Sequence, residues 1–201
     1  ERAIRLQADT FERLVLGQMH ETVGAQAGDD PVEFYLQVLA DKTGSLIASS
    51  AQAGVLFSNA PAEYRQPALE YGEKVGVAFQ LLDDVIDLSD DAAETGKVPG
   101  TDLRAGVPTM PYLLLGRAAD PASRALKATI DDGVARIADG ADPAILDEAI
   151  TQLREHAVTE ATRRQAYQWS DEAIAALDPL PAGSVRDALV RLAHVIVDRS
   201  S

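Results

Sequence analysis

The segment Gly76-Val77-Ala78-Phe79-Gln80-Leu81-Leu82-Asp83-Asp84-Val85-Ile86-Asp87 carries the clearest structural signal in this chain. Its apolar residues recur at helical spacing, and its three aspartates occupy positions i, i+1 and i+4 of the same pattern. On a helix Asp83 and Asp87 share one face, and Asp84 lies about 100° around the axis. Gln80 precedes Asp83 by one turn and joins this polar stripe.

Three aspartates in an apolar helix are unusual, because aspartate is a poor helix former and adjacent carboxylates repel. The chain has no cysteine, and no histidine lies near the trio. Carboxylate oxygens are the ligands that Mg²⁺ and Mn²⁺ prefer. We therefore expect Asp83, Asp84 and Asp87 to bind a divalent cation. The alternative interpretation is an acidic stripe on the surface.

Two lysines are candidates for binding a diphosphate. Lys42 lies inside an otherwise apolar helical segment, and Lys97 follows Asp87 in a loop that contains glycine and proline. Taken alone, each is interpreted more simply as a solvated lysine whose stem covers apolar surface. Together with the aspartates they form a candidate cradle for a metal-bridged diphosphate.

Composition excludes several classes of protein. With 201 residues, 46% of them hydrophobic, the chain is long enough and apolar enough for a globular core. A net charge of −14 repels nucleic-acid phosphate, so we expect no nucleic-acid partner. No apolar run approaches the roughly 20 residues that span a bilayer. The lack of cysteine excludes disulfides and fits a reducing cytosol.

Helical periodicity runs along the chain, and no alternating strand pattern appears. The sequence predicts an all-α fold in one domain over residues 1–201. Polar residues with glycine and proline at 90–103 predict a loop, and Asp30-Pro31 predicts a capped helix start. We expect helices at about 3–23, 31–59, 61–88 with an interruption, 108–116, 122–138, 143–157, 158–177 and 184–199.

Several motifs in a fixed order resemble those of the trans-isoprenyl (polyprenyl) diphosphate synthase family. They are Gly17-Gln18, Lys42-Thr43-Gly44-Ser45-Leu46, residues 76–87, Gly96-Lys97, Asp102-Leu103 with Gly106, and the tail from Leu189 to Arg199. The string Phe-Gln-x-x-Asp-Asp-x-x-Asp is the most specific, and the similarity covers nearly the whole chain. It implies a helical bundle of the isoprenoid synthase type, of which this chain is the C-terminal part without the N-terminal helices.

The resemblance also implies a role for each motif residue. The Mg²⁺ ligands would be Asp83, Asp84 and Asp87. The contacts to the allylic diphosphate would be Lys42 and Lys97. The residues around the reacting centre would be Thr43, Phe79 and Gln80. In the reaction of the family, metal and lysines stabilise the departing pyrophosphate, isopentenyl diphosphate attacks the allylic cation, and a proton is lost.

The chain departs from the family pattern in two ways. It contains no first aspartate-rich motif with paired arginines, and Val107 stands where many relatives carry a lysine. Because half of the metal site is absent, we expect the 201 residues alone to be inactive. The resemblance implies a homodimer and a cytoplasmic enzyme, loosely associated with membranes at most.

Three alternatives remain open at this point. The first is a regulatory or partner subunit of a heteromeric prenyl synthase, although such subunits usually lose their aspartate-rich motifs. The second is a terpene cyclase-like protein, although those enzymes typically carry a different second motif. The third is a helical module without chemistry, in which the aspartates would tolerate alanine.

Overall fold

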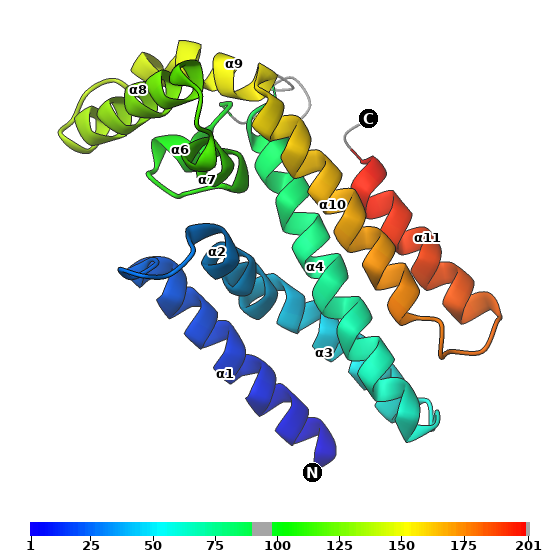
Figure 1. The fold of residues 1–201 in the computed structure, drawn as a ribbon. Helices are drawn as coiled ribbons and strands as arrows, with labels where there is room; N and C mark the ends of the chain where they lie inside the picture. Colours follow the sequence, from blue (N-terminus) through cyan, green and yellow to red (C-terminus); the bar gives the residue numbers. More distant parts are fainter. Residues whose placement is uncertain (90–97, 200–201) are drawn as a thin grey trace. The chain divides into compact units, whose positions relative to one another are not determined.

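The computed structural model describes residues 1–89 and 98–199 of the chain (Figure 1). Helices make up the regular structure of these residues, and no strand occurs among them. The all-α prediction is therefore confirmed. The elements are α1 (Arg2–Val23), α2 (Pro31–Leu39), the π-helical turn η1 (Ala40–Gly44), α3 (Ser45–Phe57), the 3-10 turn η2 (Ala62–Tyr64), α4 (Arg65–Asp87), α6 (Thr101–Arg104), α7 (Met110–Arg117), α8 (Pro121–Ala138), the 3-10 turn η3 (Pro143–Leu146), α9 (Asp147–Glu155), α10 (Ala157–Ala176) and α11 (Ser184–Asp198).

The chain divides into two compact units. Unit 1 comprises Glu1–Gln80 and Gln165–Ser201, and unit 2 comprises Leu81–Arg164. Helices α4 and α10 contribute residues to both units. The expectation of one domain over residues 1–201 stays a prediction.

The start of α2 follows the predicted capping chemistry. Oδ1 of Asp30 accepts hydrogen bonds from the backbone N–H groups of Val32, at 2.9 Å, and Glu33, at 3.1 Å. These are two of the donors that a helix leaves unpaired in its first turn. The helical run from residue 31 reaches Phe57, but it is not α-helical throughout, because η1 interrupts it at Ala40–Gly44.

Helix α6 lies inside the segment for which the sequence predicts only a loop. The helix forms here because Arg104 contacts residues distant in sequence, which the polar composition of the segment does not reveal. Arg104 donates to the carbonyl oxygens of Pro99 and Pro143, and its Nη2 lies 2.7 Å from Asp147. These bonds hold the short helix against the start of α9.

The core of unit 1 forms where α4, α10 and α11 run alongside one another (Figure 1). Tyr71 and Val75 of α4 pack against Ala173, Leu177 and Ala193. The hydroxyl of Tyr71 donates to the carbonyl oxygen of Leu189 at 2.7 Å, so its polar atom is satisfied inside the core.

The core of unit 2 is built from leucines and isoleucines that are distant in sequence. Its fully buried members include Leu88, Leu115, Ile130 and Leu153.

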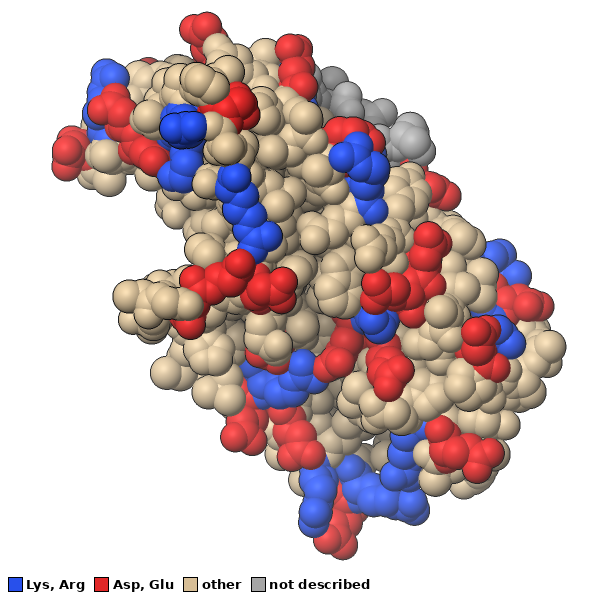
Figure 2. All heavy atoms as spheres, in the orientation of Figure 1, with Lys and Arg blue, Asp and Glu red and all other residues tan. Residues whose placement is uncertain are grey.

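Within residues 1–89 and 98–199, none of the helices combines the length and the apolar character that crossing a membrane requires. On the face drawn in Figure 2, lysines and arginines stand singly or in small groups among acidic side chains.

Candidate functional site

The last turns of α4 carry the three aspartates in unit 2. Asp83 and Asp87 are half-buried, whereas Asp84 is only 4% exposed. Oδ2 of Asp84 accepts a hydrogen bond from the backbone N–H of Met110 at 2.9 Å. Oδ2 of Asp87 accepts one from the backbone N–H of Asp102 at 3.3 Å. The segments that follow α4 therefore fold back onto the carboxylates through backbone donors.

These contacts bear on whether the aspartates fit a metal ion. In the part of the chain that the structure describes, no three acidic, histidine or cysteine side chains gather closely enough to form a metal cage. Magnesium is commonly held by one or two carboxylates together with water and phosphate oxygens. Asp83 and Asp87, one turn apart on the same helix face, match that need. The donor set fits an ion shared with a substrate and not an all-protein cage.

The basic part of the predicted site lies in unit 1. Lys42 belongs to η1, and its Nζ lies 2.5 Å from Oε2 of Glu21 on α1. Both side chains are about one-quarter exposed, which makes the ion pair partly desolvated. The sequence analysis did not identify Glu21 as the partner of Lys42. The available signal was its position one helical turn after the Gly17-Gln18 motif.

A buried glycine brings α1 close to the lysine. A Cβ atom at Gly17 would lie 2.9 Å from Cβ of Asp41 and 3.1 Å from Cγ of Lys42. Real side chains rarely tolerate such distances, so the approach of α1 to η1 requires glycine at this position. The close approach places Glu21 within reach of Lys42.

The structure brings Thr43 and Gln80 together. The hydroxyl of Thr43 donates to Oε1 of Gln80 at 3.2 Å. Two motifs separated by 37 positions therefore meet through their polar side chains. Both residues are half-buried.

Phe79, the neighbour of Gln80, contacts the end of α11. The Arg199 guanidinium lies 4.0 Å from the centroid of the Phe79 ring, and Nη2 of Arg199 donates to the Phe79 carbonyl oxygen at 3.1 Å. This combines a cation–π contact with a hydrogen bond. A substrate contact of Phe79 stays a prediction.

Glycines on α4 allow the helices that carry these residues to cross at backbone distance. A Cβ atom at Gly76 would lie 2.5 Å from Cα of Gly44, and one at Gly72 would lie 2.4 Å from Cα of Ala48. We call this contact of Gly72 and Gly76 with Gly44 and Ala48 the glycine crossing. It fixes the turn that carries Thr43 against the helix that carries Gln80.

The predicted residues thus fall into separate parts. Lys42, Thr43 and Gln80 lie in unit 1, and the aspartates lie in unit 2. Lys97 lies outside the described residues. The metal and substrate roles of all these residues stay predictions.

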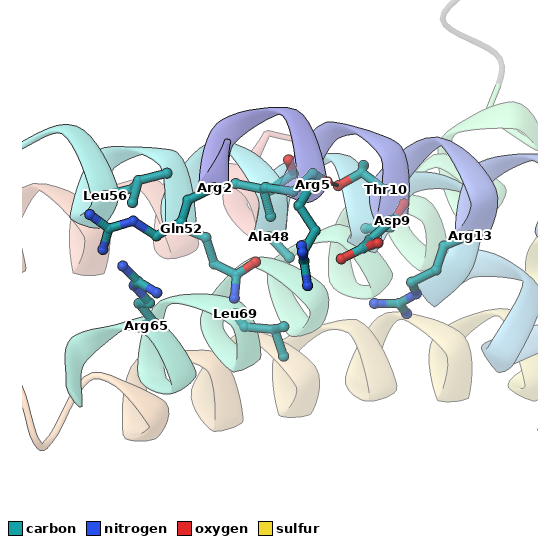
Figure 3. A pocket seen from close by; sticks show the side chains of 13 residues that line it. Arg2, Arg5, Asp9, Thr10, Arg13, Ala48, Gln52, Leu56, Arg65 and Leu69 are labelled. Carbon is teal, nitrogen blue, oxygen red and sulfur yellow. Dashed lines mark hydrogen bonds between the residues drawn. The ribbon is translucent and has the colours of Figure 1, made fainter. Parts of the chain in front are cut away.

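Unit 1 also contains a cavity that the motifs did not predict. Its volume is about 340 Å³, and it lies between α1, α3 and α4 (Figure 3). Arginines from two of these helices point into it, and Asp9, Gln52 and leucines are among the other residues that line it. The arginines are Arg2, Arg5, Arg13 and Arg65. None of the predicted site residues lines this cavity.

Comparison with known proteins places these motifs in context. The family model described as Polyprenyl synthetase matches residues 1–142. A nonaprenyl diphosphate synthase from Mycobacterium tuberculosis is 39% identical over 197 residues, covering 98% of this chain and 57% of the relative. An octaprenyl diphosphate synthase from Escherichia coli is 29% identical over 199 residues, covering 98% of this chain and 59% of the relative.

Solved structures show the same similarity. A decaprenyl diphosphate synthase from Rhodobacter capsulatus superposes with a TM-score of 0.80 at 30% identity, covering 100% of this chain and 60% of that one. A geranylgeranyl pyrophosphate synthase from Corynebacterium glutamicum, complexed with calcium and isoprenyl diphosphate, gives a TM-score of 0.82 at 35% identity and covers 98% and 60%. The chain therefore spans between 57% and 60% of the length of these relatives.

Proposed function

This chain belongs to the polyprenyl synthetase family, and from that premise we propose that the protein condenses isopentenyl diphosphate with an allylic diphosphate into a linear trans-polyprenyl diphosphate. The observation that carries the proposal is the hydrogen bond between Thr43 and Gln80, which joins two of the family's motifs. The presence of calcium and isoprenyl diphosphate in a similar solved structure supports a metal and a diphosphate as ligands.

In this proposal the aspartates serve the leaving group. Asp83, Asp84 and Asp87 would hold Mg²⁺, with Mn²⁺ as a substitute, and the bound ion supplies positive charge to the departing pyrophosphate. Asp84 has a second task, because its Oδ2 also holds the backbone of Met110. The substitution of Asp84 therefore affects the fold as well as the metal.

Lys42 would bind the same diphosphate. Its ammonium group is already paired with Glu21, so the substrate must take the place of a carboxylate partner. The ion pair keeps the lysine side chain oriented before the substrate arrives, which lowers the entropy lost on binding. Lys97 is proposed as the second lysine contact.

Thr43 and Gln80 would face the carbon centre. As the allylic C–O bond breaks, positive charge develops on the carbon, and fixed oxygen dipoles stabilise it. The hydrogen bond from Thr43 limits the conformations of the Gln80 side chain. The double bond of isopentenyl diphosphate then forms the new C–C bond, and loss of a proton completes the step. We further propose a cytoplasmic homodimer.

The direct test incubates the complete natural protein with an allylic diphosphate, radiolabelled isopentenyl diphosphate and Mg²⁺. We expect elongated, solvent-extractable products that disappear when a chelator removes the metal. Because the chain spans at most 60% of these relatives, we expect the 201 residues alone to give no product. A non-catalytic partner subunit would give no elongation even as the complete protein, and that result would refute the proposal.

A variant assigns the metal role to a residue. Asp83→Ala should lower turnover by roughly 100-fold or more, because it removes a proposed ligand of the ion that stabilises the leaving pyrophosphate. Asp132→Ala is the matched control, since Asp132 is exposed on α8 outside the motif and pairs with Arg136 one turn along the same helix. Activity retained in Asp83→Ala would remove Asp83 from the site.

A further inference from the structure

We propose that Arg13, Asp41 and Glu73 form a positioning network that holds the turn η1 in the conformation that presents Lys42 and Thr43. The inference rests on the proposed function for the ligand of Lys42. It assigns a role to three residues that lie in none of the family motifs quoted above.

The turn η1 has the hydrogen-bond pattern of a π-helix. The backbone N–H of Ser45 donates to the carbonyl oxygen of Ala40, five residues earlier, and not to that of Asp41 as in an α-helix. The hydroxyl of Ser45, a residue only 3% exposed, donates to the Asp41 carbonyl oxygen at 2.6 Å. Each residue in an α-helix turns by about 100°, so this change of hydrogen-bond register redirects the side chains that follow.

The second step is the set of contacts that fixes this geometry from outside. Nε and Nη2 of Arg13 donate to Oδ1 of Asp41 at 3.1 and 2.8 Å. Nη1 of the same guanidinium donates to the carboxylate of Glu73 on α4. Figure 3 shows Arg13 extending from α1 beside α4. One side chain thus connects α1, η1 and α4.

The third step is the burial of Asp41, which makes its position well defined. Its side chain is 13% exposed, and Nε2 of Gln37 donates to its other carboxylate oxygen at 3.0 Å. Two guanidinium nitrogens of Arg13 donate to one oxygen of Asp41, and this planar contact restrains the carboxylate more strongly than a point charge does. Because Asp41 directly precedes Lys42, this restraint acts on the backbone that carries the lysine.

The fourth step is the arrangement of partners along α1. Arg13 contacts Asp41, and Glu21, eight residues later on the same broad helix face, contacts Lys42. Between them, Gly17 allows the backbone of α1 to approach the turn. Helix α1 therefore holds two consecutive residues of η1 through two ion pairs.

The test separates positioning from general stability. In the complete protein, Arg13→Met removes the charge and keeps an unbranched side chain. Lys74→Met is the matched control, because Lys74 also makes an interhelical ion pair from α4, with Glu172 at 2.6 Å, but its partner lies on α10 and not on η1. Backbone hydrogen exchange of residues 40–46 and the affinity for pyrophosphate in the presence of Mg²⁺ are measured for both variants.

We expect Arg13→Met to accelerate exchange in residues 40–46 and to weaken pyrophosphate binding by about tenfold each, within the range typical of coupled networks. Lys74→Met should change neither. Arg13→Lys should give intermediate values, because one ammonium group cannot reproduce the fork between Asp41 and Glu73. If Arg13→Met does not fold, Glu73→Gln replaces it; this variant keeps the contact between Arg13 and Asp41, so it should accelerate exchange in the same residues by a smaller factor.

Two results would overturn the network. One is unchanged exchange at 40–46 in Arg13→Met or its replacement, and the other is equal acceleration in Lys74→Met. If the unmodified protein binds no pyrophosphate with Mg²⁺, the proposed function fails, and the exchange data still decide the structural part of the inference.

Discussion

The middle and the C-terminal end of α4 are held in place by opposite physical means. At the glycine crossing in unit 1, side chains are absent, and backbones approach so closely that an added Cβ would lie 2.4 to 2.5 Å from a neighbouring Cα. At the aspartate end in unit 2, which we call the aspartate turn (Asp83 to Asp87), charged side chains are present and backbone N–H groups gather around them. Close backbone packing fixes the structure of the first region, and hydrogen bonds to carboxylates fix the structure of the second.

The difference predicts how each region responds to substitution. A region fixed by close contact loses stability when side-chain volume is added, and this loss of unfolding free energy does not depend on charge. A region fixed by buried acceptors fails when an acceptor is removed, because the donors left behind lose both water and partner. The predictions below test this contrast.

The largest effect is expected at the glycine crossing. Gly76→Ala places a methyl group 2.5 Å from Cα of Gly44, so the helices must separate. We expect the free energy of unfolding to fall by about 3 kcal/mol, at the upper end of the range for overpacking. Urea unfolding monitored by circular dichroism measures the change.

The control for that substitution is Gly54→Ala. Gly54 lies on the exposed side of α3, and an added Cβ meets no atom within 4 Å. Alanine has the higher helix propensity, so this variant should gain up to about 1 kcal/mol. Equal losses in the two variants would contradict the claim that close contact fixes the crossing.

The aspartate turn predicts an intermediate effect. Asp84→Ala leaves the N–H of Met110 without its acceptor in a buried setting, which should cost about 1–3 kcal/mol of unfolding free energy. Asp84→Asn keeps an acceptor oxygen of similar shape and should recover part of the loss. Thermal unfolding of both variants measures the difference.

Asp83→Ala is the internal comparison for the same turn. Asp83 is half-buried, so its removal should lower the unfolding free energy less than removal of Asp84 does, while it lowers turnover. A larger loss of stability in Asp83→Ala than in Asp84→Ala would reverse the roles inferred for the two neighbours.

The motifs and most helices could be identified from the sequence, because both depend on local patterns of residues. The Asp30 cap and the helices near 2–23, 121–138 and 184–198 follow from composition and periodicity, and the structure confirms them. The π-helical turn at Lys42 was not predicted, because it depends on Gly76 and Arg13, which are distant in sequence. The pairing of Glu21 with Lys42 was not predicted, because the two residues are 21 positions apart and meet only in the fold.

A third prediction concerns the side of α4 adjacent to the glycine crossing. Tyr71 precedes Gly72, is 1% exposed, and burial raises its pKa to about 12 from an ordinary value of 10.0. The folded state therefore keeps the phenolic proton at pH values where the unfolded chain has lost it. Stability should be unaffected below pH 10 and should fall by about 1.4 kcal/mol per pH unit from there towards pH 12.

Urea unfolding at pH 9 and pH 11 tests this dependence. Tyr71→Phe loses the bond to Leu189 and should be less stable at pH 9, but its additional loss at pH 11 should be smaller. Tyr64→Phe, a half-buried tyrosine of the same unit, is the control and should keep the alkaline loss. The same alkaline loss in Tyr71→Phe as in the unmodified protein would assign the effect to other groups.

The smallest effect is expected from the ion pair of Lys74 and Glu172, which shows whether charge adds to stability beside the glycine crossing. Lys74 donates to Glu172 at 2.6 Å and thereby lowers the pKa of that carboxyl below its ordinary value of 4.5. Stability from this pair is present above pH 4.5 and is lost as the pH falls through the lowered pKa. Because the Glu172 side chain is 45% exposed, solvent screening limits the contribution to below about 1 kcal/mol.

Glu172→Gln should therefore lose slightly less stability than the unmodified protein between pH 5 and pH 3. The control is Glu148→Gln, on an exposed face of α9, which should match the unmodified protein. An acid-dependent difference larger than the loss in Gly76→Ala would show that charge, and not close contact, dominates this part of unit 1.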